Sequence, residues 1–312
     1  MKVSILIPAY NVENYITKCL ESVCRQTHED LQIVVIDDGS KDSTPQILWQ
    51  WAEKDKRIEF FSRENKGVAQ TRNELLDHAK GDYILFVDSD DWIEPEMVAT
   101  LVDISERNSV NLVMCQNVHN KRNENIGNEI SLWKKDTILN KFLEHRILTG
   151  ALWNKLIKRE IIGGLRFNPE IGYGEDALIM WNILNRIEEM AFTTNQFYHY
   201  RPNATSISSQ GLSDSKMSVI PVWEYISNSE LAKTHNLTDK AKARYGAEIS
   251  LLLFEAINNN EGNHKVAILR KKLKQLYPYI LKEKSLSYKF KLFSLISILN
   301  WTISKAIFSF TK

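Results

Sequence analysis

Short apolar runs alternate with amphipathic segments along the first 118 residues of the chain. Five apolar runs of four to nine residues predict strands, because polar or turn-forming residues bound them. They lie at 3–7, 31–36, 58–61, 83–87 and 110–118. The segments at 13–25, 44–51, 67–79 and 95–105 space their apolar residues as helices do. This alternation predicts βαβ units, and hence an α/β fold with a mainly parallel sheet flanked by helices.

The remainder of the chain is patterned differently. Residues 119–133 are polar and rich in Asn, which predicts a loop, and Asp136 is placed to begin a helix that ends near Arg146. An aromatic strand is predicted at 191–201, and the spacing is helical from Asp214 onward. We therefore expect three parts, an α/β domain over 1–210, a helical region over 211–285 and a basic amphipathic helix over 286–312.

The apolar run at 83–87 leads directly into Asp88-Ser89-Asp90-Asp91. An unbroken apolar run is typical of a strand that is buried on both faces of a parallel sheet. Carboxylates this close repel one another unless a cation or strong donors lie between them. A hard divalent ion, Mg²⁺ or Mn²⁺, suits such oxygen ligands. The alternative is a solvated turn, because Asp and Ser are common turn residues.

Two further polar clusters follow predicted strands. Pro8-Ala9-Tyr10-Asn11 follows the first strand, and Asp37-Asp38-Gly39-Ser40 follows the second. Right-handed crossovers place the carboxyl ends of parallel strands at one edge, where open α/β sheets bind ligands, so all three clusters should share that edge. The sequence has neither a Gly-x-Gly-x-x-Gly after the first strand nor a Gly-x-x-x-x-Gly-Lys-Ser/Thr motif, which argues against a dinucleotide site and a P-loop.

The composition excludes few classes of protein. With 43% hydrophobic residues, 25% charged residues and a net charge of +1, the chain is typical of a soluble globular protein and gives no general reason to expect nucleic-acid binding. The cysteines, Cys19, Cys24 and Cys115, show no metal-binding spacing, which favours a reducing compartment. The first apolar run is too short for a signal peptide, so we expect a cytoplasmic protein that is folded from its first residues.

The positive charge is concentrated at the end of the chain. Residues 264–312 contain eleven Lys or Arg and one acidic residue, a net charge of +10, which leaves −9 for residues 1–263. From 289 to 312, apolar residues recur at helical spacing, with Ser and Lys on the narrow remaining face. A basic helix of this kind suits a membrane surface, whereas Lys305 and the serines argue against a membrane span. The alternatives are a helix that packs on the preceding domain and a dimer contact.

Six short motifs carry a resemblance to a known family. They are Ser4-Ile5-Leu6-Ile7-Pro8-Ala9-Tyr10-Asn11, Ile36-Asp37-Asp38-Gly39-Ser40, Asn65-Lys66-Gly67-Val68-Ala69 with Arg72-Asn73, Val87-Asp88-Ser89-Asp90-Asp91, Trp153-Asn154-Lys155-Leu156 and Gly174-Glu175-Asp176. In this order and spacing, residues 3–208 resemble the family 2 glycosyltransferases of the GT-A fold, of the bacterial surface-polysaccharide type. The resemblance covers about two thirds of the chain and leaves out the carboxyl-terminal third.

The resemblance implies an inverting, metal-dependent transfer of a sugar from a nucleotide sugar, of the UDP-hexose type, to a growing surface glycan or a lipid-linked oligosaccharide. It implies Mn²⁺ or Mg²⁺ as the cofactor, with Asp90 as the direct ligand and Asp88 on the ribose or a metal-bound water; Asp91 could take either role. A lipid-linked acceptor suits a cytoplasmic enzyme at the inner face of the cell membrane, in contact with that surface through its last helix.

The same resemblance assigns the donor-binding residues. Asp38 would accept a hydrogen bond from the nucleotide base, between Pro8 and Tyr10, while Arg72 would contact phosphate, and Ser89 belongs to the donor-binding turn. Each has a structural alternative: Asp38 as a turn former, Pro8 as the end of the strand, and Arg72 as a solvated helix residue.

Asp176 matches the family's catalytic base, with Glu175 as its orienting neighbour. A single displacement needs one base to take the proton of the acceptor hydroxyl. The alternative is structural, because acidic residues in a first helical turn offset the helix dipole. The flanking Gly172 and Gly174, together with the upstream aspartates, favour the base. The other candidates have weaker assignments. His199 is either a third metal ligand or a packed histidine, and the rings of Trp153, Trp181 and Tyr173 either stack on sugars or belong to the core. Contacts with pyrophosphate or acceptor are possible for Lys155, Arg201 and residues 206–208.

Two rival functions remain at this point. A nucleotidyltransferase also combines an α/β sheet with a nucleotide and a metal, but its Gly-rich amino-terminal loop is missing here. A catalytically silent sugar-binding or scaffold protein could keep the same fold, although intact Asp88, Asp90 and Asp176 argue against it.

Overall fold

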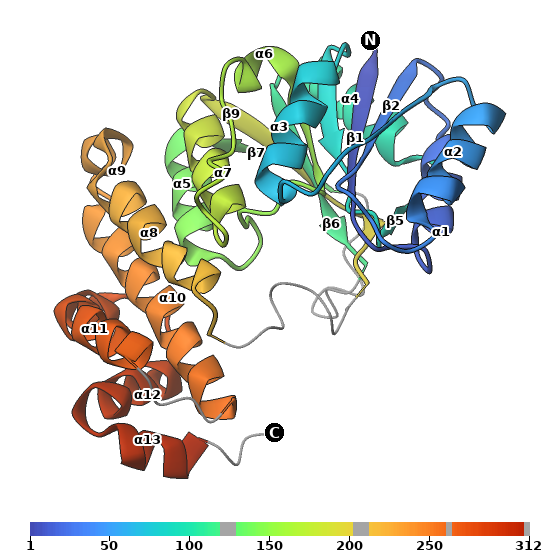
Figure 1. The fold of residues 1–312 in the computed structure, drawn as a ribbon. Helices are drawn as coiled ribbons and strands as arrows, with labels where there is room; N and C mark the ends of the chain where they lie inside the picture. Colours follow the sequence, from blue (N-terminus) through green and yellow to red (C-terminus); the bar gives the residue numbers. More distant parts are fainter. Residues whose placement is uncertain (119–128, 202–211, 260–263, 309–312) are drawn as a thin grey trace. The chain divides into compact units, whose positions relative to one another are not determined.

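The computed structural model describes residues 1–118, 129–201, 212–259 and 264–308 (Figure 1). The chain forms two compact units. The first consists of Met1–Ile138, Gly150–Glu170 and Ile179–Pro202, and the second of Leu139–Thr149, Ile171–Leu178 and Asn203–Lys312. We describe each unit by itself.

A mixed sheet of nine strands, counted over the described residues, forms the centre of the first unit. The strands are β1 (Val3–Ala9), β2 (Leu31–Asp37), β3 (Ile58–Ser62), β4 (Tyr83–Phe86), β5 (Trp92–Ile93), β6 (Leu112–Asn117), β7 (Ile130–Lys134), β8 (Lys155–Lys158) and β9 (Glu189–His199). Their order is β3-β2-β1-β4-β8-β6-β9-β5, with β7 paired to β9. The pairs within β3-β2-β1-β4 are parallel, as is β6 with β9, whereas β8, β5 and β7 run antiparallel to their neighbours.

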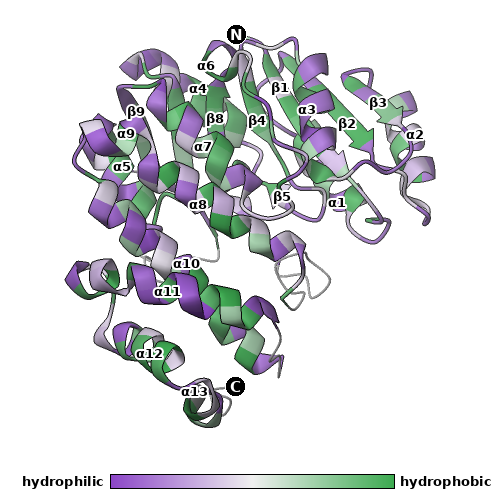
Figure 2. Ribbon diagram, turned by 60° about the vertical axis from the view of Figure 1, so that its left-hand side comes forward, coloured by the Kyte–Doolittle hydropathy of each residue, from purple (hydrophilic) through white to green (hydrophobic). Residues whose placement is uncertain are grey.

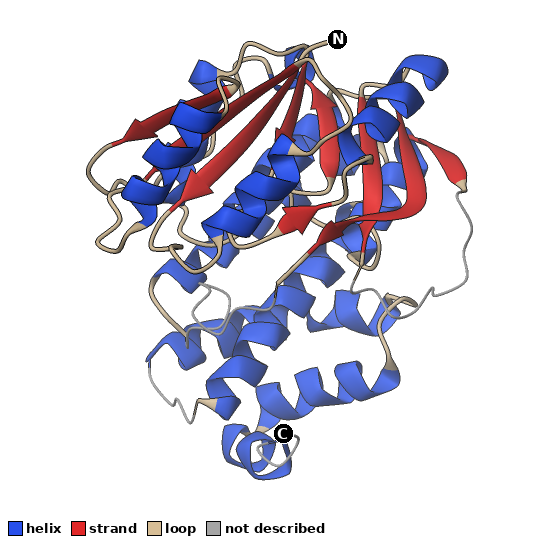
Figure 3. Cartoon of the chain, turned by 90° about the vertical axis from the view of Figure 1, so that its right-hand side faces the viewer, coloured by secondary structure: helices blue, strands red, loops and turns tan. Residues whose placement is uncertain are grey.

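Helices cover both faces of this sheet (Figure 3). They are α1 (Ile16–Cys24), α2 (Thr44–Lys54), α3 (Val68–His78), α4 (Met97–Asn108) and α6 (Arg159–Ile162), while α5 (Lys135–Glu144) and α7 (Glu175–Asn185) each span a boundary between the units. Alternate residues of the central strands, such as Ile5, Ile33 and Leu85, join one core cluster with apolar residues of α1, α2 and α4. Helix α3 packs on β1 and β2. Because both faces are covered, the strands are apolar along their length, as Figure 2 shows for β1, β2 and β4.

Strand register brings the three polar clusters to one edge. Ala9 at the end of β1 lies beside Asp37 at the end of β2, and Leu6 lies beside Phe86 at the end of β4. The Asp38 N–H donates to the Ala9 carbonyl at 2.8 Å. The predicted shared carboxyl edge is therefore confirmed. One detail differs, because β1 runs through Pro8 to Ala9 instead of ending at Pro8.

Three strands were not predicted, β5, β7 and β8, and β5 has only two residues. β8 lies antiparallel between β4 and β6, where the sequence has only two apolar residues, Leu156 and Ile157, between lysines. β7 overlaps the end of the predicted loop at 119–133, of which residues 119–128 lie outside the described residues. Only Trp133 of β7 is buried, where it stacks on Phe192 at 4.8 Å. Asp136 lies inside α5, which begins one residue earlier.

The second unit is helical as far as the structure describes it. After a short 3₁₀ helix, η3 (Ser215–Ser218), it contains α8 (Val219–Asn228), α9 (Glu230–Thr234), α10 (Thr238–Asn258), α11 (His264–Lys282), α12 (Tyr288–Leu299) and α13 (Trp301–Phe308). Helix α10 packs against α8, α11, α12 and α13. At Gly246 a Cβ atom would lie 2.7 Å from the Ile280 side chain, so the glycine permits the close approach of α10 and α11. Within the described residues, no helix combines the length and the apolar character needed to cross a membrane.

The single helix predicted over 286–312 is divided in two. The backbone is extended at Asn300, between α12 and α13. The predicted polar face is also wrong, because Ser294, Ser297 and Ser304 are buried while Leu299 and Ile303 are exposed. The last predicted positions, 309 and 310, lie outside the described residues.

Candidate active site

The turn that follows β4, the aspartate turn (residues 88–91), projects from the carboxyl edge of the sheet. Asp88 and Asp90 are half-buried, whereas Ser89 and Asp91 are buried. The Asp91 N–H donates to the Asp88 carbonyl at 3.0 Å, which closes the turn. The turn therefore presents Asp88 and Asp90 at the edge and keeps the third carboxylate inside.

Asp91 ties the aspartate turn to the end of β9. Its carboxylate accepts the Tyr198 hydroxyl at 2.8 Å and the Arg201 N–H at 2.7 Å. The Tyr198 oxygen in turn accepts the Asp88 N–H at 3.1 Å. Burial raises the pKa of Asp91 to about 7; the Arg201 N–H opposes the rise, and the negative charges of Asp88 and Asp90 add to it. The structure thus gives Asp91 an internal anchoring role.

Aromatic rings surround this anchor. Trp92 stacks on His199 at 4.7 Å, and Lys18 Nζ lies 3.2 Å from the centroid of the Trp92 ring. His199 Nε2 is hydrogen-bonded to Glu94. His199 is therefore placed as the packed histidine that was the alternative to a metal ligand. The Arg201 Nε donates to the Asp90 carbonyl at 3.1 Å, which is a second link between β9 and the turn.

Arg72 reaches the aspartate turn from α3. Its Nη2 lies 3.8 Å from Asp88 Oδ1, and its guanidinium lies 5.5 Å from the Phe167 ring. Reciprocal hydrogen bonds of 2.8 Å between the Asn73 side chain and the Phe167 backbone fix that ring. The sequence-predicted Arg72 and Asp88 are thus brought together, and Arg72 is a mostly buried residue instead of a solvated one.

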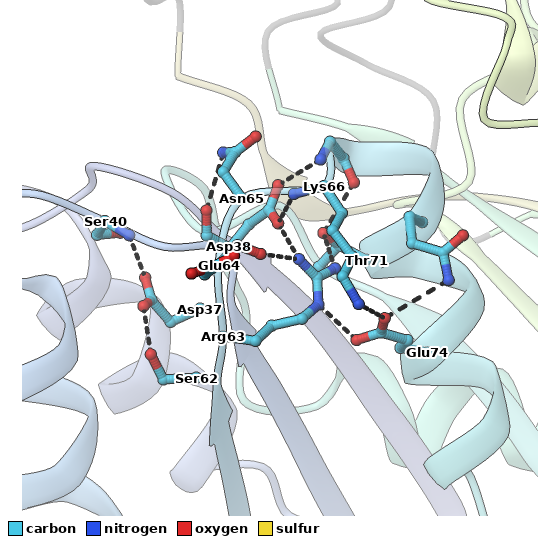
Figure 4. Close-up of polar contacts among 12 residues, drawn as sticks. Asp37, Asp38, Ser40, Ser62, Arg63, Glu64, Asn65, Lys66, Thr71 and Glu74 are labelled. Atoms are coloured by element: carbon cyan, nitrogen blue, oxygen red, sulfur yellow. Dashed lines mark hydrogen bonds and ion pairs between the residues drawn. The ribbon is translucent and has the colours of Figure 1, made fainter.

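Asp38 lies in a polar network at the same edge (Figure 4). Its carboxylate accepts the backbone N–H groups of Lys66 at 2.8 Å and Gly67 at 2.9 Å, and the guanidinium of Arg63. The Asn65 side chain donates to the Asp38 carbonyl at 2.8 Å. The carboxylate therefore already has three donors within the protein. Its predicted hydrogen bond to a nucleotide base stays a prediction.

Sequence reasoning missed Arg63, which organises this network. Besides Asp38 it binds Glu74 through Nε at 2.6 Å and the Thr71 hydroxyl through Nη2 at 3.0 Å. The register of β2 and β3 places Asp37 beside Ser62, and so brings Arg63 close to Asp38. Gly39 has a φ of +76°, and a Cβ atom there would lie 2.7 Å from the Asn65 nitrogen. The parallel pairing of the two strands was the signal that could have identified Arg63.

The remaining amino-terminal candidates lie just beyond β1. Pro8 pairs with Ile36 inside the sheet, and Tyr10 is 48% exposed, so its ring is available to a ligand. The Asn11 N–H donates to the Ser40 hydroxyl at 2.8 Å, which joins the first and second polar clusters. Glu13 accepts the Ser43 N–H at 2.8 Å, at the start of α2.

Of three lesser candidates, Lys155 and Trp181 are buried and Trp153 is half-buried. Lys155 is almost fully buried and donates to the Ala151 carbonyl at 2.5 Å and to the Asn154 side chain at 2.8 Å. Trp181 is fully buried, and Trp153 stacks on Tyr198 at 4.4 Å. Packing within the protein accounts for the position of these residues, and their candidate contacts with sugar or pyrophosphate stay predictions. The candidates at 206–208 lie outside the described residues.

In the second unit, the glycine loop (residues 172–176) precedes the body of α7. The Tyr173 N–H donates to the Ser218 hydroxyl at 2.9 Å, and the Ser218 oxygen also lies 2.9 Å from the Tyr173 carbonyl. A Cβ atom at Gly172 would lie 2.5 Å from that of Ser215, and Gly174 has a φ of +90°. Both glycines are needed where they stand, because one permits a close contact and the other a left-handed backbone.

Asp176 and Glu175 form the first turn of α7, as predicted, and both are half-buried. The Asp176 Oδ1 accepts the Ala177 N–H at 2.7 Å. Burial, together with the negative charges of Glu248, Asp176 and Glu255, raises the pKa of the neighbouring Tyr173 to about 12. The Asp176 carboxylate is therefore one of the negative charges that act on the Tyr173 hydroxyl.

A comparison with known families decides what kind of protein carries these features. The family model described as Glycosyl transferase family 2 matches residues 4–165. The chain belongs to this family.

Similar curated proteins carry related names. The chain is 31% identical to the putative glycosyltransferase EpsH of Bacillus subtilis over 216 residues, which make up 66% of this chain and 62% of EpsH. It is 32% identical to the glycosyltransferase GlyA of Streptococcus pneumoniae over 222 residues, 66% of this chain and 31% of GlyA. It is 28% identical to the cholesterol galactosyltransferase of Borreliella burgdorferi over 234 residues, 70% of this chain and 65% of that protein. The chain thus spans less than two thirds of these relatives.

Solved structures show that the fold is shared over nearly the whole chain. S. aureus TarS 1–349 in complex with UDP-GlcNAc matches with a TM-score of 0.73 at 19% identity, covering 99% of this chain and 89% of that one. The mannosyltransferase PcManGT from Pyrobaculum calidifontis, in complex with GDP-Man and Mn²⁺, matches with a TM-score of 0.52 at 17% identity, covering 99% and 86%. The predicted GT-A fold with a helical carboxyl-terminal region is confirmed.

The aspartate turn of this family 2 chain fits a divalent cation. The described residues contain no ready-made group of three His, Cys, Asp or Glu side chains around one point. Mg²⁺ and Mn²⁺ do not require one, because one or two carboxylates and the substrate phosphates complete their shell. Asp88 and Asp90 supply two hard oxygen donors on one turn, and their charges raise the pKa of the buried Asp91. A bound cation would offset part of this negative charge.

A cavity elsewhere in the first unit is a poorer candidate. It has a volume of about 650 Å³ and lies at the opposite edge, where β4 begins. Three of its charged side chains are engaged within the protein, since Arg166 pairs with Asp77 at 2.6 Å and the Arg159 Nε donates to the Gly81 carbonyl at 2.6 Å. We therefore keep the carboxyl edge as the candidate site in the first unit. Glu175 and Asp176 belong to the second unit, and their place in one cleft with the aspartate turn stays a prediction.

Proposed function

We propose that the protein is an inverting, metal-dependent glycosyltransferase that moves a sugar from a nucleotide sugar to a growing surface glycan or a lipid-linked oligosaccharide. The observation that carries the proposal is the aspartate turn, which presents Asp88 and Asp90 at the carboxyl edge with Arg72 3.8 Å from Asp88. Membership of glycosyl transferase family 2 supports the same conclusion.

The donor would lie along this edge. Pro8 and Tyr10 would line the pocket of the base, with Asp38 as its acceptor and Ser89 and Asp88 nearer the ribose. A UDP-sugar of the hexose type is the donor we favour, and the UDP-GlcNAc complex of the similar TarS fold supports that class. Asp38 can accept one bond more, because a carboxylate offers about four lone-pair sites and three are used here.

Asp90 and Asp88 would hold Mn²⁺ or Mg²⁺ beside the diphosphate. When bound, such an ion stabilises the negative charge that develops on the departing diphosphate. Arg72 adds a positive charge 3.8 Å from Asp88. The chain's own residues thus orient the diphosphate through Arg72 and the aspartate turn, which Asp91 keeps in place.

Asp176 would take the proton from the acceptor hydroxyl as that oxygen attacks the anomeric carbon, with Glu175 orienting the acceptor. The bond from the sugar to the diphosphate breaks as the new glycosidic bond forms, so the anomeric configuration inverts. The glycine loop supports this role, because its fixed backbone places a half-buried carboxylate at the start of α7.

The place of action follows from the acceptor class. A lipid-linked acceptor would bring the enzyme to the cytoplasmic, inner face of the cell membrane, in contact with that surface through its last helices. The rival functions are a nucleotidyltransferase and a catalytically silent protein of the same fold. Neither gains support, because Pro8-Ala9-Tyr10-Asn11 replaces a Gly-rich loop and the carboxylates are intact.

Release of UDP is the decisive measurement. A panel of nucleotide sugars, screened by thermal shift with Mn²⁺, would first identify the donor. The proposal expects sugar transfer with release of the nucleoside diphosphate, and loss of this release when EDTA removes the cation. Release of pyrophosphate from a nucleoside triphosphate would instead identify a nucleotidyltransferase. Donor binding without any turnover would identify a silent protein.

A further inference from the structure

The serines of the last two helices lie inside the second unit. Ser294 of α12 is hydrogen-bonded to Ser250 of α10 at 2.9 Å, and Ser297 is hydrogen-bonded to Ser304 of α13 at 2.9 Å. All four side chains are fully buried or nearly so. Because hydroxyls that pair with one another are satisfied, a serine-lined face can pack closely without exposing its polar groups to solvent.

On α12, the side opposite the buried serines is apolar and open to solvent, and α13 exposes Ile303 and Ile307. We call it the C-terminal apolar face, made of Tyr288, Leu292, Leu299, Ile303 and Ile307. Leu299 is 72% exposed, Ile303 50% and Ile307 49%. Large apolar residues that are exposed along successive turns are candidates for a surface that meets a partner or a membrane.

Lysines flank this face. At about 100° per residue, Leu292 and Leu299 lie on the middle of the exposed side of α12, with Lys289 on one margin and Lys291 on the other. Lys289 is exposed, while Lys291 Nζ reaches the Leu281 carbonyl at 2.9 Å. Four further exposed lysines lie in α11 or just after it, Lys271, Lys274, Lys282 and Lys284. Apolar residues between basic margins are typical of helices that lie in a membrane interface.

We propose that the C-terminal apolar face binds an anionic lipid surface, with α12 and α13 lying in the interface. The biological role of this surface rests on the proposed function, because a lipid-linked acceptor would be met there. The positions of the exposed residues do not depend on catalysis. Helices of 12 and 8 residues are too short to cross a bilayer, which needs about 20 residues. Charge favours lipid over a second copy, because a dimer would bring two segments of net charge +10 together.

Vesicle sedimentation tests the proposal directly with the full chain. One set of vesicles contains phosphatidylcholine alone, and the other mixes it with phosphatidylglycerol. The first variant, Leu299→Glu with Ile303→Glu, places charge on the apolar face, and the second, Lys289→Gln with Lys284→Gln, removes two exposed positive charges. Trp49→Glu is the matched control, because Trp49 is an exposed apolar residue of α2, at 60%. Circular dichroism verifies that each variant is folded.

The chain should sediment with anionic vesicles and much less with neutral ones, and added salt should weaken this binding. The Leu299→Glu, Ile303→Glu variant should bind anionic vesicles at least about tenfold more weakly than the parent. The binding of the lysine variant should be a few-fold weaker, and Trp49→Glu should bind as the parent does. Equal binding by the apolar-face variant would overturn the proposal. The proposal would also be wrong if the parent chain did not bind vesicles but formed dimers, and the Leu299→Glu, Ile303→Glu variant was monomeric. UDP release toward a soluble acceptor tests the enzyme separately.

Discussion

The aspartate turn and the glycine loop both carry acidic residues, but they are held in different ways. The aspartate turn is anchored by side chains, because buried Asp91 binds Tyr198 and the Arg201 backbone while Tyr198 also binds the Asp88 N–H. The glycine loop is anchored through its backbone, by the Ser218 hydroxyl. A turn that holds a cation needs fixed carboxylate oxygens, whereas a loop that presents one base needs a fixed backbone.

The two regions also differ in how far the family accounts for them. The family model covers residues 4–165 and so includes the aspartate turn, but it ends before the glycine loop. Ser218 lies 45 residues beyond the Tyr173 that it binds, in the helical second unit. The helical region thus contributes to a loop that we propose to be catalytic. Variants of the two regions should therefore affect donor binding and transfer separately.

Asp90→Ala should have the largest effect. Removal of the direct metal ligand should lower kcat/KM for UDP release by about 10⁴-fold, because a bound metal supplies several kcal/mol of charge stabilisation. The donor should also lose its Mn²⁺-dependent thermal shift. Asp103→Ala is the control, since Asp103 forms an exposed ion pair with Arg107 on α4. Retention of the thermal shift by Asp90→Ala would place the cation elsewhere.

Asp176→Ala should stop transfer and spare the donor. Loss of a general base costs about 10²- to 10⁴-fold, so kcat should fall by that factor while the Mn²⁺-dependent thermal shift with the donor is unchanged. Single-turnover measurements with saturating donor would separate chemistry from binding. Normal turnover by Asp176→Ala would show that another group takes the proton and that the glycine loop has only a structural role.

Tyr198→Phe should affect the aspartate turn through its anchor. The variant keeps the stacking on Trp153 at 4.4 Å but leaves one Asp91 oxygen and the Asp88 N–H without this partner. The free energy of unfolding should fall by about 1–3 kcal/mol, the cost of an unsatisfied buried polar group. Denaturant titration measures that loss, and calorimetry should show weaker Mn²⁺ binding in the presence of UDP. Unchanged Mn²⁺ affinity would mean that the turn does not need its anchor.

Much of the first unit could be predicted from sequence. Buried parallel strands are nearly continuous apolar runs, so β1, β2 and β4, and the edge on which they end, follow from the pattern. The antiparallel β8 and the edge strand β7 could not be predicted, because one is four residues long and the other buries only Trp133. Arg63 was missed because its contact with Asp38 depends on strand register, which the sequence does not state.

The second unit was harder to predict, for a physical reason. The hydrophobic pattern predicted that the serines of α12 face solvent, but Ser294 is buried and hydrogen-bonded to Ser250. The Ser218 hydroxyl holds the glycine loop by hydrogen bonding to the backbone of Tyr173, and no sequence motif indicates such a contact. Pattern reasoning therefore located Asp176 without locating what holds it.

Ser218→Ala should give the smallest effect and the sharpest comparison. It removes one hydroxyl from the Tyr173 backbone, and a net hydrogen bond of about 1 kcal/mol corresponds to a roughly fivefold loss in kcat if the loop must be fixed for Asp176 to act. KM for the donor and Mn²⁺ affinity should stay unchanged, in contrast to Tyr198→Phe. Ser218→Thr keeps a hydroxyl and should restore most of the rate.

An equal loss in Ser218→Thr, or a loss that appears in donor KM, would mean that the substitution disturbs the fold and that the hydroxyl does not position the base. If instead Ser218→Ala turned over normally while Asp176→Ala was inactive, the glycines alone would suffice to fix the loop.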